Sequence, residues 1–218
     1  MRYDLHTHSK YSPDSILEPR EIVKQGRKRR LAGIAVTDHN TIKGGLEAKR
    51  YETDDFKVIV GSEIMTDRGE IIGLFLDAEV EPAEFGAVIE GIKEQGGIVV
   101  VPHPFDRIRP ALQPKDEDAK FIDCIEGFNS RCLFQSYNER AVEFASRHKL
   151  PVTAGSDAHF RWEIGNAFIR ASASSEEELK CDILNNEIGY DGRLGNPLNQ
   201  GLSKVLKIWK RATSSRNR

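Results

Sequence analysis

The chain contains 218 residues, of which 39% are hydrophobic and 30% charged, and its formal net charge at pH 7 is −2. These values are ordinary for a soluble protein, and the near-neutral charge removes any electrostatic requirement for a nucleic-acid partner. The apolar runs stay well below the roughly 20 residues that cross a bilayer, and the chain opens on a strand-like segment rather than a signal peptide. We therefore expect a cytoplasmic protein with no membrane partner, folded as a single domain over residues 1–218.

The first half of the chain alternates between apolar runs and amphipathic segments. A basic run at 27–30 ends the first amphipathic segment, where cations complement a helix dipole; a phosphate-binding patch is the alternative. Such alternation favours parallel βαβ units. The expected helices cover about 19–30, 42–51 and 82–95, and the expected strands precede His6 and cover 34–37, 58–60, 71–76 and 98–101.

The second half continues the pattern less regularly. Residues 106–120 contain two prolines and are expected to form an irregular connection with one short helix. Ser174-Ser175 followed by three glutamates predicts a helix start, because serine caps the first turn and acidic residues suit its dipole. The other expected elements are strands over 121–128 and 151–154, a last strand over 165–170, and helices over 135–149 and 202–212.

The helix expected over 202–212 has one apolar stripe among lysines and an arginine. The stripe consists of Leu202, Val205, Leu206 and Trp209. Because such a face is normally covered, we expect it to pack on the rest of the domain, with Trp209 in the core; a dimer contact is the alternative, and the oligomeric state is left open. Residues 213–218 are expected to be disordered.

Histidines in this chain are concentrated where apolar runs end. The sequence has six histidines, and all but His148 occupy such positions, namely His6, His8, His39, His103 and His159. In an extended strand, His6 and His8 project from the same face, with Cα atoms ~6–7 Å apart, so their imidazoles can share one divalent ion. If the strand ends meet at one face, as in a parallel β/α barrel, these side chains converge on a single polar centre.

Five motifs in this order resemble those of the PHP (polymerase and histidinol phosphatase) family. They are Asp-Leu-His-Thr-His-Ser at 4–9, Thr-Asp-His-Asn at 37–40, Gly-Ser-Glu at 61–63, Pro-His-Pro at 102–104 and Gly-Ser-Asp-Ala-His at 155–159. The resemblance implies a distorted seven-stranded β/α (TIM-like) barrel with a metal site at the C-terminal ends of the strands. It also implies two or three divalent metal ions and hydrolysis of phosphate esters by a metal-activated water.

The resemblance further implies a division of the ligands among the metals. His6, His8, Glu63 and Asp157 would hold the first metal, and Glu63 would bridge to a second that His103 also binds. The third would take Asp14, His39 and His159. Mixed imidazole and carboxylate ligation suits zinc, manganese or iron, with magnesium also open, and does not select among them.

One position departs from the family pattern, because Glu70 stands where many members have a histidine. A carboxylate there would give the second metal a harder oxygen ligand and favour manganese, iron or magnesium. The alternatives are a weak second site and a solvent-exposed turn residue at Glu70.

Residues beyond the ligands are candidates for substrate binding and proton transfer. Asn129 and Arg131 follow a strand-like run, and Arg131 would clamp a phosphate; a salt-bridged surface arginine is the alternative. Asp38 would orient a ligating imidazole or assist proton transfer, and Asp4 would act similarly beside His6 or cap the barrel floor.

These features lead us to expect a phosphoesterase acting on a phosphomonoester of a small metabolite or nucleotide. A nuclease acting on single-stranded ends is the alternative within the same chemistry, so a nucleic-acid partner is possible but not required. A catalytically degenerate barrel that serves as a binding module is the alternative of another class.

Overall fold

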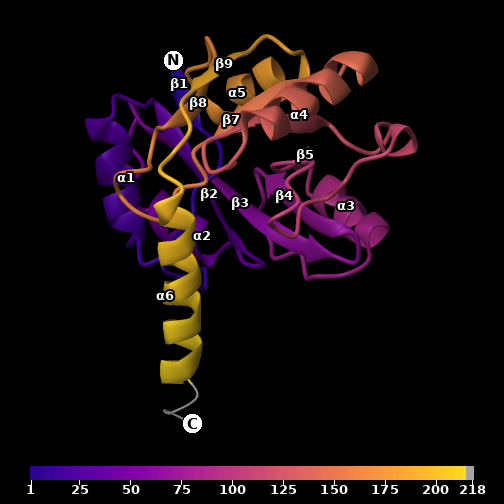
Figure 1. The fold of residues 1–218 in the computed structure, drawn as a ribbon. Helices are drawn as coiled ribbons and strands as arrows, with labels where there is room; N and C mark the ends of the chain where they lie inside the picture. Colours follow the sequence, from indigo (N-terminus) through magenta and orange to yellow (C-terminus); the bar gives the residue numbers. More distant parts are fainter. Residues whose placement is uncertain (215–218) are drawn as a thin grey trace.

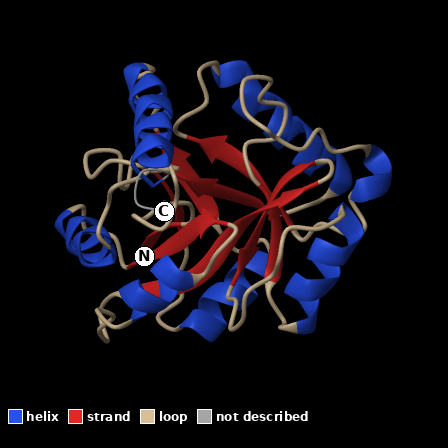
Figure 2. Cartoon of the chain, turned by 90° about the horizontal axis from the view of Figure 1, so that it is seen from below, coloured by secondary structure: helices blue, strands red, loops and turns tan. Residues whose placement is uncertain are grey.

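The computed structural model describes residues 1–214, which form a nearly closed β-barrel surrounded by helices (Figures 1 and 2). Its nine-stranded sheet has the order β7-β6-β5-β4-β3-β2-β1-β8-β9. Seven strands make the barrel: β1 (Arg2–Asp4), β2 (Gly33–His39), β3 (Lys57–Thr66), β4 (Gly69–Leu74), β5 (Ile98–Val101), β6 (Cys124–Asn129) and β7 (Val152–Gly155).

The barrel closes between the segments that follow β1 and β7. Thr7 and Ala158 form an isolated parallel bridge. The backbone N–H of His8 donates to the carbonyl of Ala158 (2.9 Å), and that of Asp157 donates to the carbonyl of His6 (2.7 Å). The expected TIM-like barrel is therefore confirmed, and its closing seam runs through two of the histidine motifs.

Two features of the sheet differ from the expectation. β4 is antiparallel to both β3 and β5, because two residues between β3 and β4 allow a hairpin but no crossover. The run at 165–170 is not the last strand: β8 (Ala167–Arg170) pairs antiparallel with β1 and with β9 (Gly189–Gly192). β9 is short and exposed and has no apolar alternation that would have revealed it.

The helices lie close to their expected positions. They are α1 (Pro19–Lys28), α2 (Lys43–Lys49), α3 (Phe85–Glu94), α4 (Gln135–His148), α5 (Glu176–Leu184) and α6 (Leu198–Ser214), with a short 3-10 helix at Asp116–Asp118. Local chemistry sets their ends. Pro19 opens α1, and the Ser175 hydroxyl accepts from the Glu178 N–H at the start of α5.

Three clusters of buried apolar residues hold these layers together. One takes a residue from each of the seven barrel strands: Tyr3, Ala35, Ile59, Ile72, Val100, Cys124 and Ala154. A second joins α3 and α4 to the sheet, and a third joins α1 and α2. The strands are thus packed on both faces of the sheet by apolar side chains.

The C-terminal helix contradicts the sequence-based expectation. α6 begins four residues earlier, and most of its apolar stripe is exposed: Leu202 at 50%, Val205 at 65% and Trp209 at 60%, whereas Leu206 is half-buried. Its buried residues are polar, namely Asn199, Gln200 and Ser203. The helix therefore meets the barrel through its polar side, and the packing predicted for the stripe and for Trp209 is wrong.

The helix also extends through 213 and 214, which were expected to be disordered; 215–218 lie outside the described residues. Among residues 1–214, every helix is too short or too polar to cross a bilayer.

Candidate metal centre

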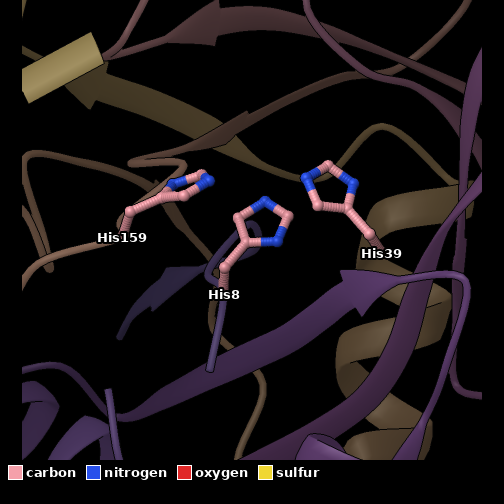
Figure 3. A group of neighbouring side chains, drawn as sticks. All are labelled: His8, His39 and His159. Carbon is pink, nitrogen blue, oxygen red and sulfur yellow. The ribbon is translucent and has the colours of Figure 1, made fainter. Parts of the chain in front are cut away.

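The nine ligand candidates of the sequence lie together at the C-terminal ends of the barrel strands. Four overlapping groups have nitrogen and oxygen atoms within 4.8 Å of one another: His8, His39 and His159 (Figure 3); His6, Glu63 and His103; His6, His8 and Asp157; and His39, Glu63 and Glu70. Asp14 joins them through His39 and His159. The register of the sheet brings two of these side chains together, because the pairing of β2 with β3 places His39 opposite Glu63.

His6 and His8 point their Nε2 atoms toward each other at 3.1 Å. The Nδ1 of His6 lies 3.0 Å from Glu126 Oε1, so that nitrogen carries a proton and donates it. The Nδ1 of His8 lies 3.1 Å from the Ser12 hydroxyl, which itself donates to Asp38 Oδ1 at 2.6 Å, so the hydroxyl accepts from His8. Because Nδ1 is the donor in both rings, Nε2 is the nitrogen that can offer a lone pair to a cation bound between them.

The Asp38 carboxylate accepts from the Ser9 backbone N–H and hydroxyl and from the Ser12 hydroxyl, and it is fully buried. Of the two roles expected for Asp38, the contacts favour the orientation of His8 through Ser12. Direct proton transfer is not supported, because Asp38 does not line the cavity described below. Asp4 similarly binds Ser156 and Gly165, which fixes the loop after β7 rather than an imidazole.

Glu63 lies at the centre of the cluster. Its Oε1 is 2.9 Å from His103 Nε2, and its Oε2 is 3.0 Å from His39 Nδ1. Burial opposes its ionisation, but the neighbouring histidines, His6 and His39 foremost, hold the pKa of Glu63 well below its usual range. The side chain is therefore a carboxylate with one oxygen toward each side of the cluster, as a bridging ligand requires.

Glu70 is buried at 5% exposure, which excludes the solvent-exposed turn residue. Its Oε1 lies 3.6 Å from His39 Nδ1, and its Oε2 lies 3.8 Å from His103 Nε2. Burial and the Glu63 charge raise the pKa of Glu70 to about 8. Without a compensating cation Glu70 is therefore mostly protonated beside the Glu63 carboxylate, and a bound dication would allow both to be ionised.

Asp14 joins two histidines of the cluster, His39 and His159. The Asp14 oxygens lie 3.4 Å from His39 Nε2 and 3.3 Å from His159 Nε2. His159 Nδ1 faces the Asp157 carbonyl at 2.9 Å and so donates to it, leaving Nε2 free. Among the described residues, the buried Asp14 Oδ1 has His159 as an ion-pair partner but no hydrogen bond, so it could serve as a metal ligand.

Strained backbone aims two of these side chains. His103 has φ 31° and Asp157 has φ 53°, in the left-handed region that costs energy for residues other than glycine. Gly155 lets this turn lie against His6, because a Cβ at that position would overlap the His6 side chain. The turns after β5 and β7 thus place His103 and Asp157 among the other ligand candidates.

Asn129 and Arg131 differ in their position relative to the cavity. Asn129 is fully buried and donates to Glu126 Oε2 (2.9 Å) and Asp157 Oδ2 (3.2 Å), while its own oxygen accepts from the Arg131 N–H. It does not line the cavity, so it positions the ligands rather than binding substrate. Arg131 is buried rather than on the surface, pairs with Glu163 at 3.6 Å and does line the cavity.

The sequence analysis did not identify three charged residues of the site. Glu126 orients His6 and accepts from the His103 N–H; an acidic residue within an apolar strand was an available signal. Glu163 accepts from the His159 N–H at 3.0 Å. Arg109, in the irregular segment, bonds Asp106 and Asp157 and lines the cavity. Neither Glu163 nor Arg109 falls in a motif or periodic pattern.

A cavity opens onto the cluster, and α6 forms part of its wall. Four carboxylates and three imidazoles line one side, and Arg109 and Arg131 lie beside them. The α6 residues of the lining are Gln200, Ser203, Lys204 and Lys207. The cavity is therefore lined both by side chains that can bind a metal ion and by basic side chains.

Comparisons with known proteins agree with this geometry. A family model described as PHP-associated matches residues 135–186. An uncharacterised protein of Methanocaldococcus jannaschii is 45% identical over 145 residues, which is 60% of this chain and 82% of that protein.

Solved structures share the fold. A two-domain protein of Bacteroides vulgatus containing a predicted PHP-like metal-dependent phosphoesterase has a TM-score of 0.73 at 19% identity, over 88% of this chain and 65% of that longer protein. A lesion-specific endonuclease of Pyrococcus furiosus has a TM-score of 0.61 at 18% identity, over 85% of this chain and 56% of the other.

Proposed function

Because the chain belongs to the PHP family, we propose that it is a metal-dependent phosphoesterase that hydrolyses a phosphomonoester of a small metabolite or nucleotide. The observation that carries this proposal is the convergence of nine imidazole and carboxylate side chains at one end of the barrel. The likeness to a protein containing a predicted PHP-like metal-dependent phosphoesterase supports the reaction class.

The donor set fits two or three divalent ions. His6, His8, Asp157 and Glu63 would hold the first, and Glu63, His103 and Glu70 the second. Asp14, His39 and His159 would hold the third. Zinc, manganese, iron and magnesium are the candidates, and bound ions of this kind lower the pKa of water and stabilise charge on phosphoryl oxygens.

The protein's own side chains prepare this site. Glu126 and the Asp38–Ser12 pair fix the His6 and His8 tautomers, so that the Nε2 atoms are available without rotation of the rings. Arg131 would bind phosphate oxygens, since its buried guanidinium is held at the cavity by Glu163 and Ser203.

The test is hydrolysis by metal-stripped protein with and without added manganese or zinc. The substrates are a panel of phosphomonoesters, nucleotides and short single strands. We expect metal-dependent release of phosphate from small esters. Asp157→Asn and His8→Ala should each lose at least ~100-fold in kcat, because each removes a ligand. Circular dichroism should show both variants folded.

The matched control is His148→Ala, because His148 is the histidine outside the cluster and pairs with Asp116. This variant should keep full activity. Full activity in Asp157→Asn, or turnover without any metal, would contradict the proposal.

A nuclease is the second candidate, favoured by the likeness to the lesion-specific endonuclease. It predicts release of nucleotides from the short strands of the same panel, with affinity that falls steeply as salt rises. A binding module without catalysis would bind metal but turn over nothing in the panel.

A further inference from the structure

Two lysines of α6 line the cavity and have no partner. Lys204 and Lys207 make no ion pair or side-chain hydrogen bond with any other residue among those described. Their neighbour Lys210 differs, because its Nζ donates to the backbone carbonyls of Lys10 (3.0 Å) and Ser12 (2.9 Å). α6 therefore uses one lysine for attachment to the barrel and presents two others, still uncompensated, to the cavity.

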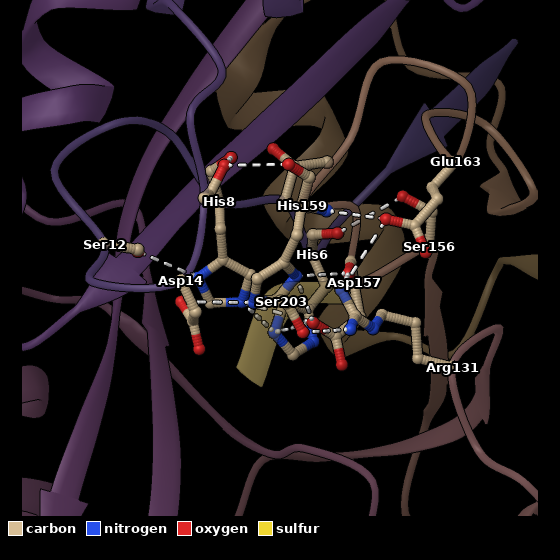
Figure 4. Close-up of polar contacts among 12 residues, drawn as sticks. His6, His8, Ser12, Asp14, Arg131, Ser156, Asp157, His159, Glu163 and Ser203 are labelled. Atoms are coloured by element: carbon tan, nitrogen blue, oxygen red, sulfur yellow. Dashed lines mark hydrogen bonds and ion pairs between the residues drawn. The ribbon is translucent and has the colours of Figure 1, made fainter. Parts of the chain in front are cut away.

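Polar contacts fix the position of this part of α6 relative to the cluster. Arg131 donates to the Ser203 hydroxyl at 2.7 Å and to the Asn199 carbonyl at 3.3 Å. Asn199 in turn donates to Glu163 Oε1 at 2.9 Å. Since Glu163 also holds the His159 backbone N–H, the helix is connected to the ligand-bearing loop by a chain of buried hydrogen bonds (Figure 4).

The helical repeat then aims both lysines at the cavity. Gln200, Ser203, Lys204 and Lys207 follow the spacing i, i+3, i+4 and i+7, which places them on one face. Ser203 and Gln200 bind the barrel through Arg131, so the same face carries Lys204 and Lys207 over the opening.

The charges that line the cavity leave Lys204 and Lys207 without a compensating negative charge. The cavity is lined by four carboxylates, Asp14, Glu63, Glu70 and Asp157, and two dications would already neutralise them. Arg109 is paired with Asp106 and Asp157, and Arg131 with Glu163. The charges of Lys204 and Lys207 are therefore left for a ligand.

We propose that Lys204 and Lys207 form a second anion subsite, so that the preferred substrate carries a second phosphate group in addition to the one bound at the metal centre. This inference rests on the proposed function and narrows its substrate class to small molecules with two phosphates. Two adjacent ammonium groups match a phosphate better than a neutral sugar or base, because each can donate up to three hydrogen bonds.

The test uses ligands that resist hydrolysis, so that binding is measured apart from turnover. Isothermal titration calorimetry on the manganese-loaded protein compares propane-, butane- and pentane-diphosphonate with the monophosphonate of each chain length. We expect the best diphosphonate to bind roughly 10-fold tighter than its monophosphonate, because charge-assisted contacts are made at both ends.

Variants of α6 assign the gain to the two lysines. The double variant Lys204→Gln with Lys207→Gln should lose the diphosphonate gain and keep monophosphonate affinity. Glutamine preserves helix propensity, and the lysines lie outside the core, so folding should be unchanged. Arg211→Gln is the matched control, since Arg211 is exposed on the same helix and does not line the cavity.

Equal affinity for mono- and diphosphonates at every length would overturn the subsite. So would an equal loss for both ligands in the double variant, which would mean that the lysines serve the phosphate at the metal centre. Hydrolysis of p-nitrophenyl phosphate, measured separately, tests the proposed function. If the protein prefers diphosphonates but does not hydrolyse the ester, the second anion subsite is supported and the proposed hydrolase is rejected. If it hydrolyses the ester but shows no such preference, the hydrolase is supported and the subsite is rejected.

Discussion

Glu70 illustrates how much a single residue decides in this site. It stands where many members of the family have a histidine, yet it is buried between His39 and His103 and shares their neighbour Glu63. Its pKa of about 8 reflects burial and the Glu63 charge, so the ionised form needs a compensating cation. This is the environment of a ligand rather than of a surface turn.

Replacement of Glu70 should therefore change metal content. We expect Glu70→Ala to bind one metal ion fewer than the wild type, because the second site keeps only Glu63 and His103. Glu70→His should restore the ion and shift preference toward zinc, since imidazole is the softer ligand. Elemental analysis after dialysis measures both, and an unchanged metal count in Glu70→Ala would show that the carboxylate is not a ligand.

At the scale of the element, α6 separates its two faces in an unusual way. The polar side packs on the barrel, while Leu202, Val205 and Trp209 stay exposed. An amphipathic pattern tells that a helix has two faces but not which face meets its neighbour. Here the barrel surface offers Arg131, Glu163 and backbone carbonyls as partners, so the polar face is the complementary one.

The stability of the chain should therefore depend little on the exposed stripe. We expect Leu202→Gln with Val205→Gln to change the free energy of unfolding by less than about 0.5 kcal/mol, as at other exposed positions. Leu179→Ala, at a fully buried position of α5, should cost roughly 2–5 kcal/mol. Urea unfolding measures both, and a large loss in the α6 variant would reveal that the stripe is covered in solution.

At the scale of the whole molecule, the metal centre coincides with the seam that closes the barrel. The Thr7–Ala158 bridge lies between the ligands His6 and His8 on one segment and Asp157 and His159 on the other. The seam has few backbone hydrogen bonds, whereas β2 and β3 pair over seven residues. A bound ion would therefore connect the two edges of the sheet that meet at this seam.

Metal removal should accordingly loosen the seam first. Ligand binding stabilises a native state by about 4 kcal/mol when the free ligand is at 1,000 times its dissociation constant, so chelation should lower the melting temperature. Hydrogen exchange should accelerate at 5–9 and 154–159 and remain slow at 58–62. Uniform acceleration across all three segments would show that the ion stabilises the fold globally rather than at the seam.

Much of the architecture followed from local sequence signals. Apolar runs, Pro19 and Ser175 were sufficient to place most strands and helices within a few residues, since these signals act over one turn or one strand. β9 and the antiparallel course of β4 were not predicted, because pairing direction depends on turn length and on partners distant in the chain.

The sequence by itself determined which side chains could gather at the barrel mouth, because five histidines and their carboxylate neighbours each end a strand-like run. Only the tertiary structure decided what surrounds them. Glu126 reaches the cluster from within an apolar strand, and Arg109 and Glu163 reach it from segments without a periodic pattern. The side of α6 that meets the barrel depends on complementary partners there. Residue type and spacing are local properties, whereas burial and partner choice arise when distant segments pack together.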